Sequence, residues 1–194
     1  MVDFRMRAAA ISIMTEAEYL AFDLANEGKH EFVNGEVTAM AGASFAHLTI
    51  HTNLTGLLFV ALRGRPCRTV GSDARVRIDE TGLYAYPDLT VYCGPPDTAP
   101  TNPPSLLNPK VIIEILSEAT ADYDQGAKAA HYRLRPTVEA VLFVDSRRQF
   151  VQIQTRNGDG TWTLDDRRSG DVRITAIGVT LTFDEIYEGV DFTA

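Results

Sequence analysis

Lysine is scarce in this 194-residue chain, which contains Lys29, Lys110 and Lys128 and no others. Acidic residues outnumber basic ones by 26 to 18, and the formal net charge is −8. Because non-specific nucleic-acid binding depends on a basic surface, this balance argues mildly against it. A local basic groove stays open, since arginines gather in two clusters, although solvated surface charge is the commoner reason for such clusters. The clusters are Arg63, Arg65, Arg68, Arg75 and Arg77, and Arg147, Arg148, Arg167 and Arg168.

Cysteine is almost as rare, with Cys67 and Cys93 alone. Two cysteines this far apart form no zinc-binding motif, which excludes the cysteine-rich metal modules. Two thiols in a chain of this size fit a reducing cytoplasm, where we place the protein, with one disulfide left as the alternative.

Long apolar runs are also missing, so we predict no membrane-spanning segment. The start of the chain has Arg5 and Arg7 ahead of a short apolar stretch, residues 8–14. That stretch is only about as long as the shortest signal-peptide core, and no clear cleavage site follows it. We therefore expect residues 1–13 to be a flexible leader and residues 14–194 to form a single domain.

The first half of the chain has clear local signals. Thr15 and Glu18 have the capping-box spacing and predict a helix over residues 16–26. Asn34-Gly35 between two extended runs predicts a hairpin over residues 30–40. Ser44 caps a long amphipathic helix that runs to about Arg63. Two strands follow, over residues 68–79 and 83–92, and then an irregular Pro-rich loop over residues 94–104.

The second half predicts a parallel strand pair. Residues 110–116 and 139–145 are apolar runs typical of buried strands, and residues 119–134 between them have a helical pattern. A helix between two such strands indicates a crossover connection, so we expect the strands to be parallel. A second hairpin over residues 149–164 follows, then short strands at 172–174 and 179–183 and a last helix from Phe183.

Two acidic residues in these strands point to chemistry. Glu114 interrupts the apolar run of residues 111–116, and Asp88 follows Pro87 one strand earlier. A buried carboxylate is costly unless something pairs with it. With Lys128 on the next helix, the pair indicates a site for a hard cation such as Mg²⁺ or Mn²⁺, which prefers oxygen ligands. The alternative is that backbone N–H groups or Lys128 itself satisfy the two acids.

His47 and His51 lie four residues apart on one face of the long helix, a spacing that can bind zinc. The glutamate of a zinc-protease motif is missing, because position 48 is leucine. Surface or hydrogen-bonded histidines are therefore the favoured interpretation, and a zinc enzyme is a weaker alternative.

Taken together, these motifs resemble the PD-(D/E)xK nuclease superfamily and, more narrowly, the Uma-type restriction endonucleases. The resemblance covers about residues 14–187. It rests on Thr15-x-x-Glu18-Tyr19, on His30-Glu31-x-x-Asn34-Gly35-Glu36, on His47, on Pro87-Asp88-Leu89, on Glu114-Ile115-Leu116-Ser117, and on Tyr123-Asp124-x-x-x-Lys128-x-x-x-Tyr132.

The resemblance implies a restriction-endonuclease-like α/β (α+β) fold, a mixed sheet flanked by helices with an N-terminal hairpin and a C-terminal hairpin. It implies metal ligation by Asp88, Glu114 and the backbone carbonyl of Ile115. The superfamily usually has lysine two residues after the glutamate, but position 116 is leucine, and the resemblance assigns that role to Lys128. Glu31 corresponds to an early acidic residue of the superfamily, whereas from its strand pattern alone it would be an exposed charge.

Two functions follow as hypotheses. The first is an endonuclease that depends on Mg²⁺ or Mn²⁺, hydrolyses phosphodiester bonds of DNA and associates as a homodimer, with Glu31, Asp88, Glu114 and Lys128 as its catalytic residues. The second is a non-enzymatic dimeric binding or regulatory module on an inactive nuclease scaffold. The acidic composition and the displaced lysine favour the second hypothesis, and the presence of every motif carboxylate favours the first.

Overall fold

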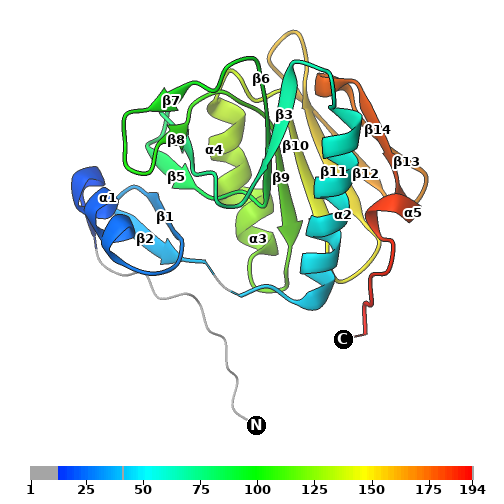
Figure 1. The fold of residues 1–194 in the computed structure, drawn as a ribbon, viewed down its shortest axis with the longest axis horizontal. Helices are drawn as coiled ribbons and strands as arrows, with labels where there is room; N and C mark the ends of the chain where they lie inside the picture. The colour runs from blue at the N-terminus through cyan, green and yellow to red at the C-terminus, as the bar shows by residue number, and fades with distance from the viewer. Residues whose placement is uncertain (1–12, 41, 194) are drawn as a thin grey trace.

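The protein contains two six-stranded mixed sheets (Figure 1). A computed structural model describes residues 13–40 and 42–193. Within these residues the first sheet has the order β2-β1-β5-β4-β8-β7 and the second the order β12-β11-β10-β9-β6-β3. This arrangement, an α+β fold with helices on the sheets, confirms the predicted fold class.

The first sheet is built from short strands. They are β1 (His30–Val33), β2 (Glu36–Ala39), β4 (Val76–Ile78), β5 (Leu83–Ala85), β7 (Thr98–Ala99) and β8 (Ser105–Leu106). The hairpin of β1 and β2 is as predicted, with positive φ of 52° at Asn34 and 88° at Gly35, the values that a type I′ turn requires. The Pro-rich stretch predicted to be irregular carries β7, which pairs with β8.

Helix α1 (Glu16–Ala25) begins at Thr15, whose side chain and that of Glu18 form the predicted capping box. Tyr19 of α1 stacks on Phe32 of the hairpin, which ties the helix to the first sheet. The predicted leader lies outside the described residues except for Ile13, which bridges to Glu36.

Both strands predicted for residues 68–79 and 83–92 are wrong in the same way. Each divides into two strands that belong to different sheets: β3 (Cys67–Gly71) and β6 (Leu89–Cys93) lie in the second sheet, while β4 and β5 lie in the first. The physical reason differs between them. A turn with a hydrogen bond from Ala74 N–H to the Gly71 carbonyl separates β3 from β4. Pro87, which has no N–H to donate to a ladder, separates β5 from β6.

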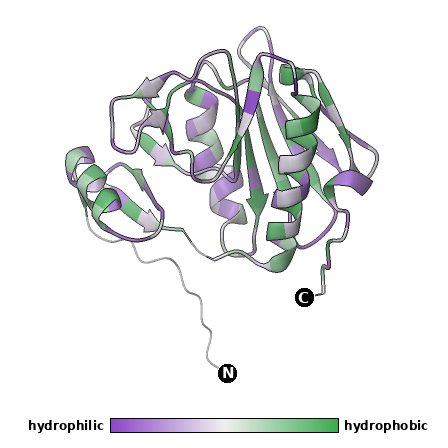
Figure 2. Cartoon of the chain, viewed as in Figure 1, coloured by the Kyte–Doolittle hydropathy of each residue, from purple (hydrophilic) through white to green (hydrophobic). Residues whose placement is uncertain are grey.

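The second sheet holds the main core. Its remaining strands are β9 (Pro109–Leu116), β10 (Ala140–Asp145), β11 (Val151–Arg156) and β12 (Trp162–Arg167). β9 and β10 are parallel, as predicted. Ile113 and Ile115 pack with α2 (Phe45–Ala61), whereas Ile112 and Leu116 pack with Tyr132 on the other face. Figure 2 shows the hydrophobic residues along these central strands.

The helix predicted over residues 119–134 consists of three segments. α3 (Ala121–Tyr123) leads into a π-helical segment, η1 (Asp124–Lys128), and then into α4 (Ala129–Leu134). Gly126, a poor helix former, lies in the middle of the π-helical segment. Asp124 and Lys128, its first and last residues, are both buried. A π-helical turn inside an α-helix is frequent at functional sites.

The remaining elements lie on the right side of the molecule in Figure 1. They are β13 (Asp171–Ile174), the 3₁₀ helix η2 (Thr175–Ile177), β14 (Val179–Thr182) and α5 (Phe183–Ile186). β13 and β14 pair with each other, and α5 has a capping box of Thr182 and Glu185. Cys67 and Cys93, opposite each other on β3 and β6, form a disulfide, so the alternative left open by the sequence is the one observed. In the part of the chain that is described, no helix has the length and apolar character needed to cross a bilayer.

Candidate functional site

Asp88 lies where the chain passes from the first sheet to the second, just before β6. On β6 and β9 Leu89 pairs with Ile113, and continuing this antiparallel register by one residue sets Asp88 opposite Glu114. The Asp88 Oδ2 atom accepts a hydrogen bond of 2.7 Å from the Ile115 N–H. The two acids predicted as metal ligands are therefore cross-strand neighbours, as the motif spacing implied.

Glu114 shares a face of β9 with Ile112 and Leu116, so its carboxylate lies in an apolar layer and is only 3% exposed. Its Oε1 atom accepts hydrogen bonds from the Tyr132 hydroxyl at 2.6 Å and from the Lys128 ammonium at 3.0 Å. These two donors offset part of the cost of burying the charge.

Lys128 reaches the site, which residue spacing alone left undecided. Its Nζ atom lies 2.7 Å from Glu31 Oε1, 3.0 Å from Glu114 Oε1 and 3.5 Å from Asp124 Oδ1. Glu31 is buried rather than exposed, so the interpretation of its charge from strand pattern alone is wrong. It also accepts a hydrogen bond from the Tyr86 N–H. One ammonium group is thus shared by three buried carboxylates.

Burial and the nearby charges shift the pKa values of Glu114, Asp124 and Lys128. Burial raises the pKa of Glu114 to about 8; Lys128 opposes the increase, and Asp124, Asp88 and Glu31 add to it. Burial likewise raises the pKa of Asp124. For Lys128, burial alone would lower the pKa, but the surrounding anionic groups raise it well above its usual range. The lysine therefore stays charged, while Glu114 and Asp124 hold a proton more readily than isolated carboxyl groups do.

Sequence reasoning left three partners of this cluster without a role. Asp124 and Tyr132 share the predicted helix face with Lys128, but only the fold shows that this face meets Glu114. His47 is the third: its Nε2 atom lies 3.2 Å from Asp88 Oδ1. The neighbouring His51 points its Nε2 at the Asp88 backbone carbonyl, at 3.1 Å. Both histidines thus direct their Nε2 atoms at Asp88.

The donor set suits a hard cation without presenting a finished metal cage. Among residues 13–40 and 42–193, no three His, Cys, Asp or Glu side chains are already arranged to hold a metal ion. Asp88 and Glu114 nevertheless bring two carboxyl groups to facing positions of the chain, and carboxylate oxygens are the ligands that Mg²⁺ and Mn²⁺ prefer. Three buried carboxylates share the single ammonium group of Lys128 here, and a divalent ion would add positive charge to the cluster.

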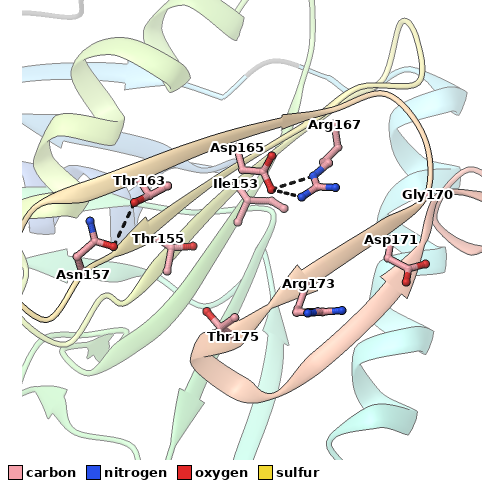
Figure 3. A pocket seen from close by; sticks show the side chains of 10 residues that line it. All are labelled: Ile153, Thr155, Asn157, Thr163, Asp165, Arg167, Gly170, Asp171, Arg173 and Thr175. Atoms are coloured by element: carbon pink, nitrogen blue, oxygen red, sulfur yellow. Dashed lines mark hydrogen bonds and ion pairs between the residues drawn. The ribbon is translucent and has the colours of Figure 1, made fainter.

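A pocket of about 740 Å³ lies elsewhere, between the β11–β12 hairpin and β13 (Figure 3). Thr155, Asp165, Arg167 and Arg173 are among the residues that line it. Asp165 pairs with Arg167 inside it, and none of the candidate site residues takes part. The pocket therefore does not extend the cluster around Glu114.

Comparison with known proteins finds relatives that match most of the chain. Over 180 residues the chain is 31% identical to the uncharacterized protein slr1290 of Synechocystis sp. strain PCC 6803, covering 92% of this chain and 94% of that one. It is 33% identical over 159 residues to sll1609 of the same organism, covering 82% and 90%. A crystal structure from Anabaena variabilis, described as "a putative nuclease belonging to DUF820", superimposes with a TM-score of 0.70 at 15% identity, covering 90% of this chain and 97% of that one.

The likeness to the Anabaena structure concerns the fold, because the two sequences are only 15% identical. The family model named Uma2, with the description "Putative restriction endonuclease", matches residues 16–183. That range includes the cluster of Glu31, Asp88, Glu114 and Lys128. Since the match extends over most of the chain, from the first helix to the start of the last, the protein belongs to the Uma2 family.

Proposed function

We propose that this protein is a nuclease that hydrolyses phosphodiester bonds of DNA and requires Mg²⁺ or Mn²⁺. The observation that carries the proposal is the convergence of Glu31, Asp88, Glu114 and Lys128 from four separate elements of the fold. Membership of a family described as restriction endonucleases supports it.

Asp88, Glu114 and the Ile115 carbonyl would hold the metal ion in this proposal. The ion would supply positive charge for the developing phosphate charge and lower the pKa of a bound water. Lys128, which stays protonated, orients Glu114 and provides a second positive charge for the transition state. Glu31 holds the ammonium group of Lys128 at 2.7 Å and so fixes its position in the site.

A titration of metal-free protein with Mn²⁺, followed by calorimetry, tests the proposal without knowledge of the substrate. We expect the parent protein to bind Mn²⁺. Mutation of a residue that only hydrogen-bonds to a metal ligand typically lowers metal affinity by about 10–100-fold, and we expect Asp88→Asn and Glu114→Gln, which change the ligands themselves, each to lower it further. These variants keep the size of the side chain. Asp122→Asn, which changes an exposed carboxylate on α3, should bind like the parent. A parent protein without Mn²⁺ binding would contradict the proposal.

Cleavage is the second measurement. Circular, linear and single-stranded DNA and RNA are incubated with the parent and with Asp88→Asn in Mg²⁺ and in Mn²⁺. We expect DNA cleavage by the parent only. Equal cleavage by the parent and by Asp88→Asn would assign it to a contaminant or to another site.

A non-enzymatic module on the same scaffold is the second candidate, and two observations favour it. Lys128 and Glu114 are each only 3% exposed, so a phosphate group does not reach them without a rearrangement. Part of the positive charge of the two arginine clusters is already neutralised, since Arg147 and Arg148 both pair with Asp145 and Arg75 is buried with Asp23. Mn²⁺ binding without cleavage of any substrate would support this candidate.

We also propose that two copies associate through α2. The helix has no charged residue, yet Phe45 is 83% exposed and Phe59 60% exposed, with Leu48 and Val60 beside them. An uncharged helix face with exposed aromatic residues is typical of an interface. Sedimentation velocity should show a dimer for the parent and a monomer for Phe59→Glu, and a monomeric parent would rule out this interface.

A further inference from the structure

Helix α2 brings two histidines to one residue of the candidate site. Ser44 caps the helix by accepting a hydrogen bond from the His47 N–H, and the buried Ile50 fixes the helix on the second sheet. His47 and His51, one turn apart, then face the same way. The His47 Nε2 atom lies 3.2 Å from Asp88 Oδ1, and the His51 Nε2 atom lies 3.1 Å from the Asp88 carbonyl oxygen.

The surroundings of the two rings decide where their protons lie. The Nδ1 atom of His47 is buried and has no hydrogen-bond partner among residues 13–40 and 42–193. A proton there would be an unpaired buried donor, so the proton belongs on Nε2 and is donated to Asp88. For His51 the partner is a carbonyl oxygen, which only accepts, so its Nε2 also carries a proton.

Asp88 is therefore held at three points. Its Oδ1 atom accepts from His47, its Oδ2 atom accepts from the Ile115 N–H at 2.7 Å, and its backbone carbonyl accepts from His51. Hydrogen bonds to a ligating carboxylate orient it toward the metal ion, and such outer partners typically contribute about 10–100-fold to metal affinity.

We propose that His47 and His51 are positioning residues for Asp88 in the metal site, with His47 acting on the carboxylate and His51 on the backbone. This inference rests on the proposed function, because it takes Asp88 to be a metal ligand. It assigns the histidine pair to orientation of an oxygen ligand rather than to zinc coordination.

Replacement of His47 by two different amides tests the role of a single atom. The Nε2 atom of histidine is three bonds from Cβ, as is the amide nitrogen of glutamine, whereas the amide nitrogen of asparagine is two bonds away. His47→Gln thus keeps a donor at about the right distance from Asp88, and His47→Asn and His47→Ala do not. A role limited to helix stability would make His47→Ala at least as good as His47→Gln, because alanine is the best helix former, whereas a role of the donor atom makes His47→Ala weak.

The experiment is Mn²⁺ titration of the parent, the three His47 variants and His131→Ala, a control that removes a histidine of α4 outside the cluster. We expect His47→Ala and His47→Asn to bind about 10–100-fold more weakly, and His47→Gln and His131→Ala to bind within about threefold of the parent. Thermal melting of each variant shows whether it is folded. If His47→Ala does not fold, the comparison between His47→Gln and His47→Asn tests the inference.

Three outcomes would overturn the inference. Parent-like Mn²⁺ affinity in both His47→Ala and His47→Asn would leave the proposed function standing and remove the role of His47. Equal weakening in His47→Gln and His47→Asn, together with stoichiometric Zn²⁺ binding by the parent alone, would make His47 a direct ligand. Absence of Mn²⁺ binding in the parent would refute the proposed function and this inference together.

Discussion

Lys128→Met should lower the free energy of unfolding of the metal-free protein by about 3–5 kcal/mol, the usual cost of removing one partner from a buried ion pair. Methionine has nearly the length of lysine, so the change removes the charge and leaves little cavity. Three carboxylates then lie in the interior without their shared cation. Urea unfolding in the presence of EDTA measures the loss.

The matched control is Lys110→Met. Lys110 pairs with Glu139, but that pair is partly exposed, and exposed pairs contribute about 0–1 kcal/mol. The double variant Lys128→Met/Glu31→Gln should recover part of the loss, because one uncompensated charge is gone. If Lys128→Met and Lys110→Met had equal effects, the ammonium group of Lys128 would not be bound in the carboxylate cluster.

The pH dependence of the same measurement has a defined sign. The folded-state pKa of Glu114, about 8, lies above its ordinary value of 4.5, so the folded protein holds a proton that the unfolded chain releases. The stability from this group is complete below pH 4.5 and is lost as the pH rises through about 8, with a slope of up to about 1.4 kcal/mol per pH unit. Lys128→Met should extend this loss to higher pH, because Lys128 lowers the pKa of Glu114, and Glu114→Gln should remove the loss. A parent protein equally stable at pH 6 and pH 8 would contradict the raised pKa.

Arg75→Met should destabilise the fold by a similar amount, about 3–5 kcal/mol. Arg75 is 1% exposed and donates to Asp23 Oδ2 at 2.8 Å, to Ser105 Oγ at 2.8 Å and to the Pro103 carbonyl at 2.6 Å. Its loss leaves the buried Asp23 carboxylate without its guanidinium partner, and it also releases the segment between β7 and β8. Thermal and urea unfolding measure the effect.

The network of Arg75 also adjoins the candidate site. Asp23 accepts hydrogen bonds from the Tyr86 hydroxyl at 2.6 Å and from the backbone N–H of His30, the neighbour of Glu31. The double variant Asp23→Asn/Arg75→Met should be more stable than Arg75→Met, since it removes the stranded charge. Arg167→Met, at an exposed ion pair on β12, is the control and should change stability little. Equal effects at the two arginines would contradict the buried network.

Local sequence patterns were sufficient to predict most elements of the fold. The Asn34-Gly35 turn, the caps at Thr15 and Ser44, and the parallel β9 and β10 all depend on residues close in sequence, and all are confirmed. The sheet changes at residues 72–75 and 86–88 were missed. The residues on both sides of each break have an extended pattern, so only the fold shows that the turn before β4 and the break at Pro87 carry the chain into a different sheet.

The residues of the candidate site also fall into those that the sequence predicted and those that it did not. Asp88 and Glu114 stood out because a charge interrupts or precedes an apolar run, and the structure makes them neighbours. His47 and Tyr132 carry no such signal, because their importance lies in contacts to residues 41 and 18 positions away. Asp23 and Arg75, 52 positions apart, form their pair across two elements that no local pattern links. The assignment of metal ligands and catalytic residues stays a prediction that the variants above test.

The arrangement of the buried cluster depends on the number of residues in the π-helical segment η1. Each residue of an α-helix advances the side chain by about 100° around the axis. Deleting exposed Gly126 would take out one such step and allow a continuous α-helix from Ala121 to Leu134, so Lys128 and Tyr132 could no longer both keep their register with Asp124. A one-residue gap that leaves every side chain of the cluster in the sequence would thereby separate the ammonium group from its carboxylates.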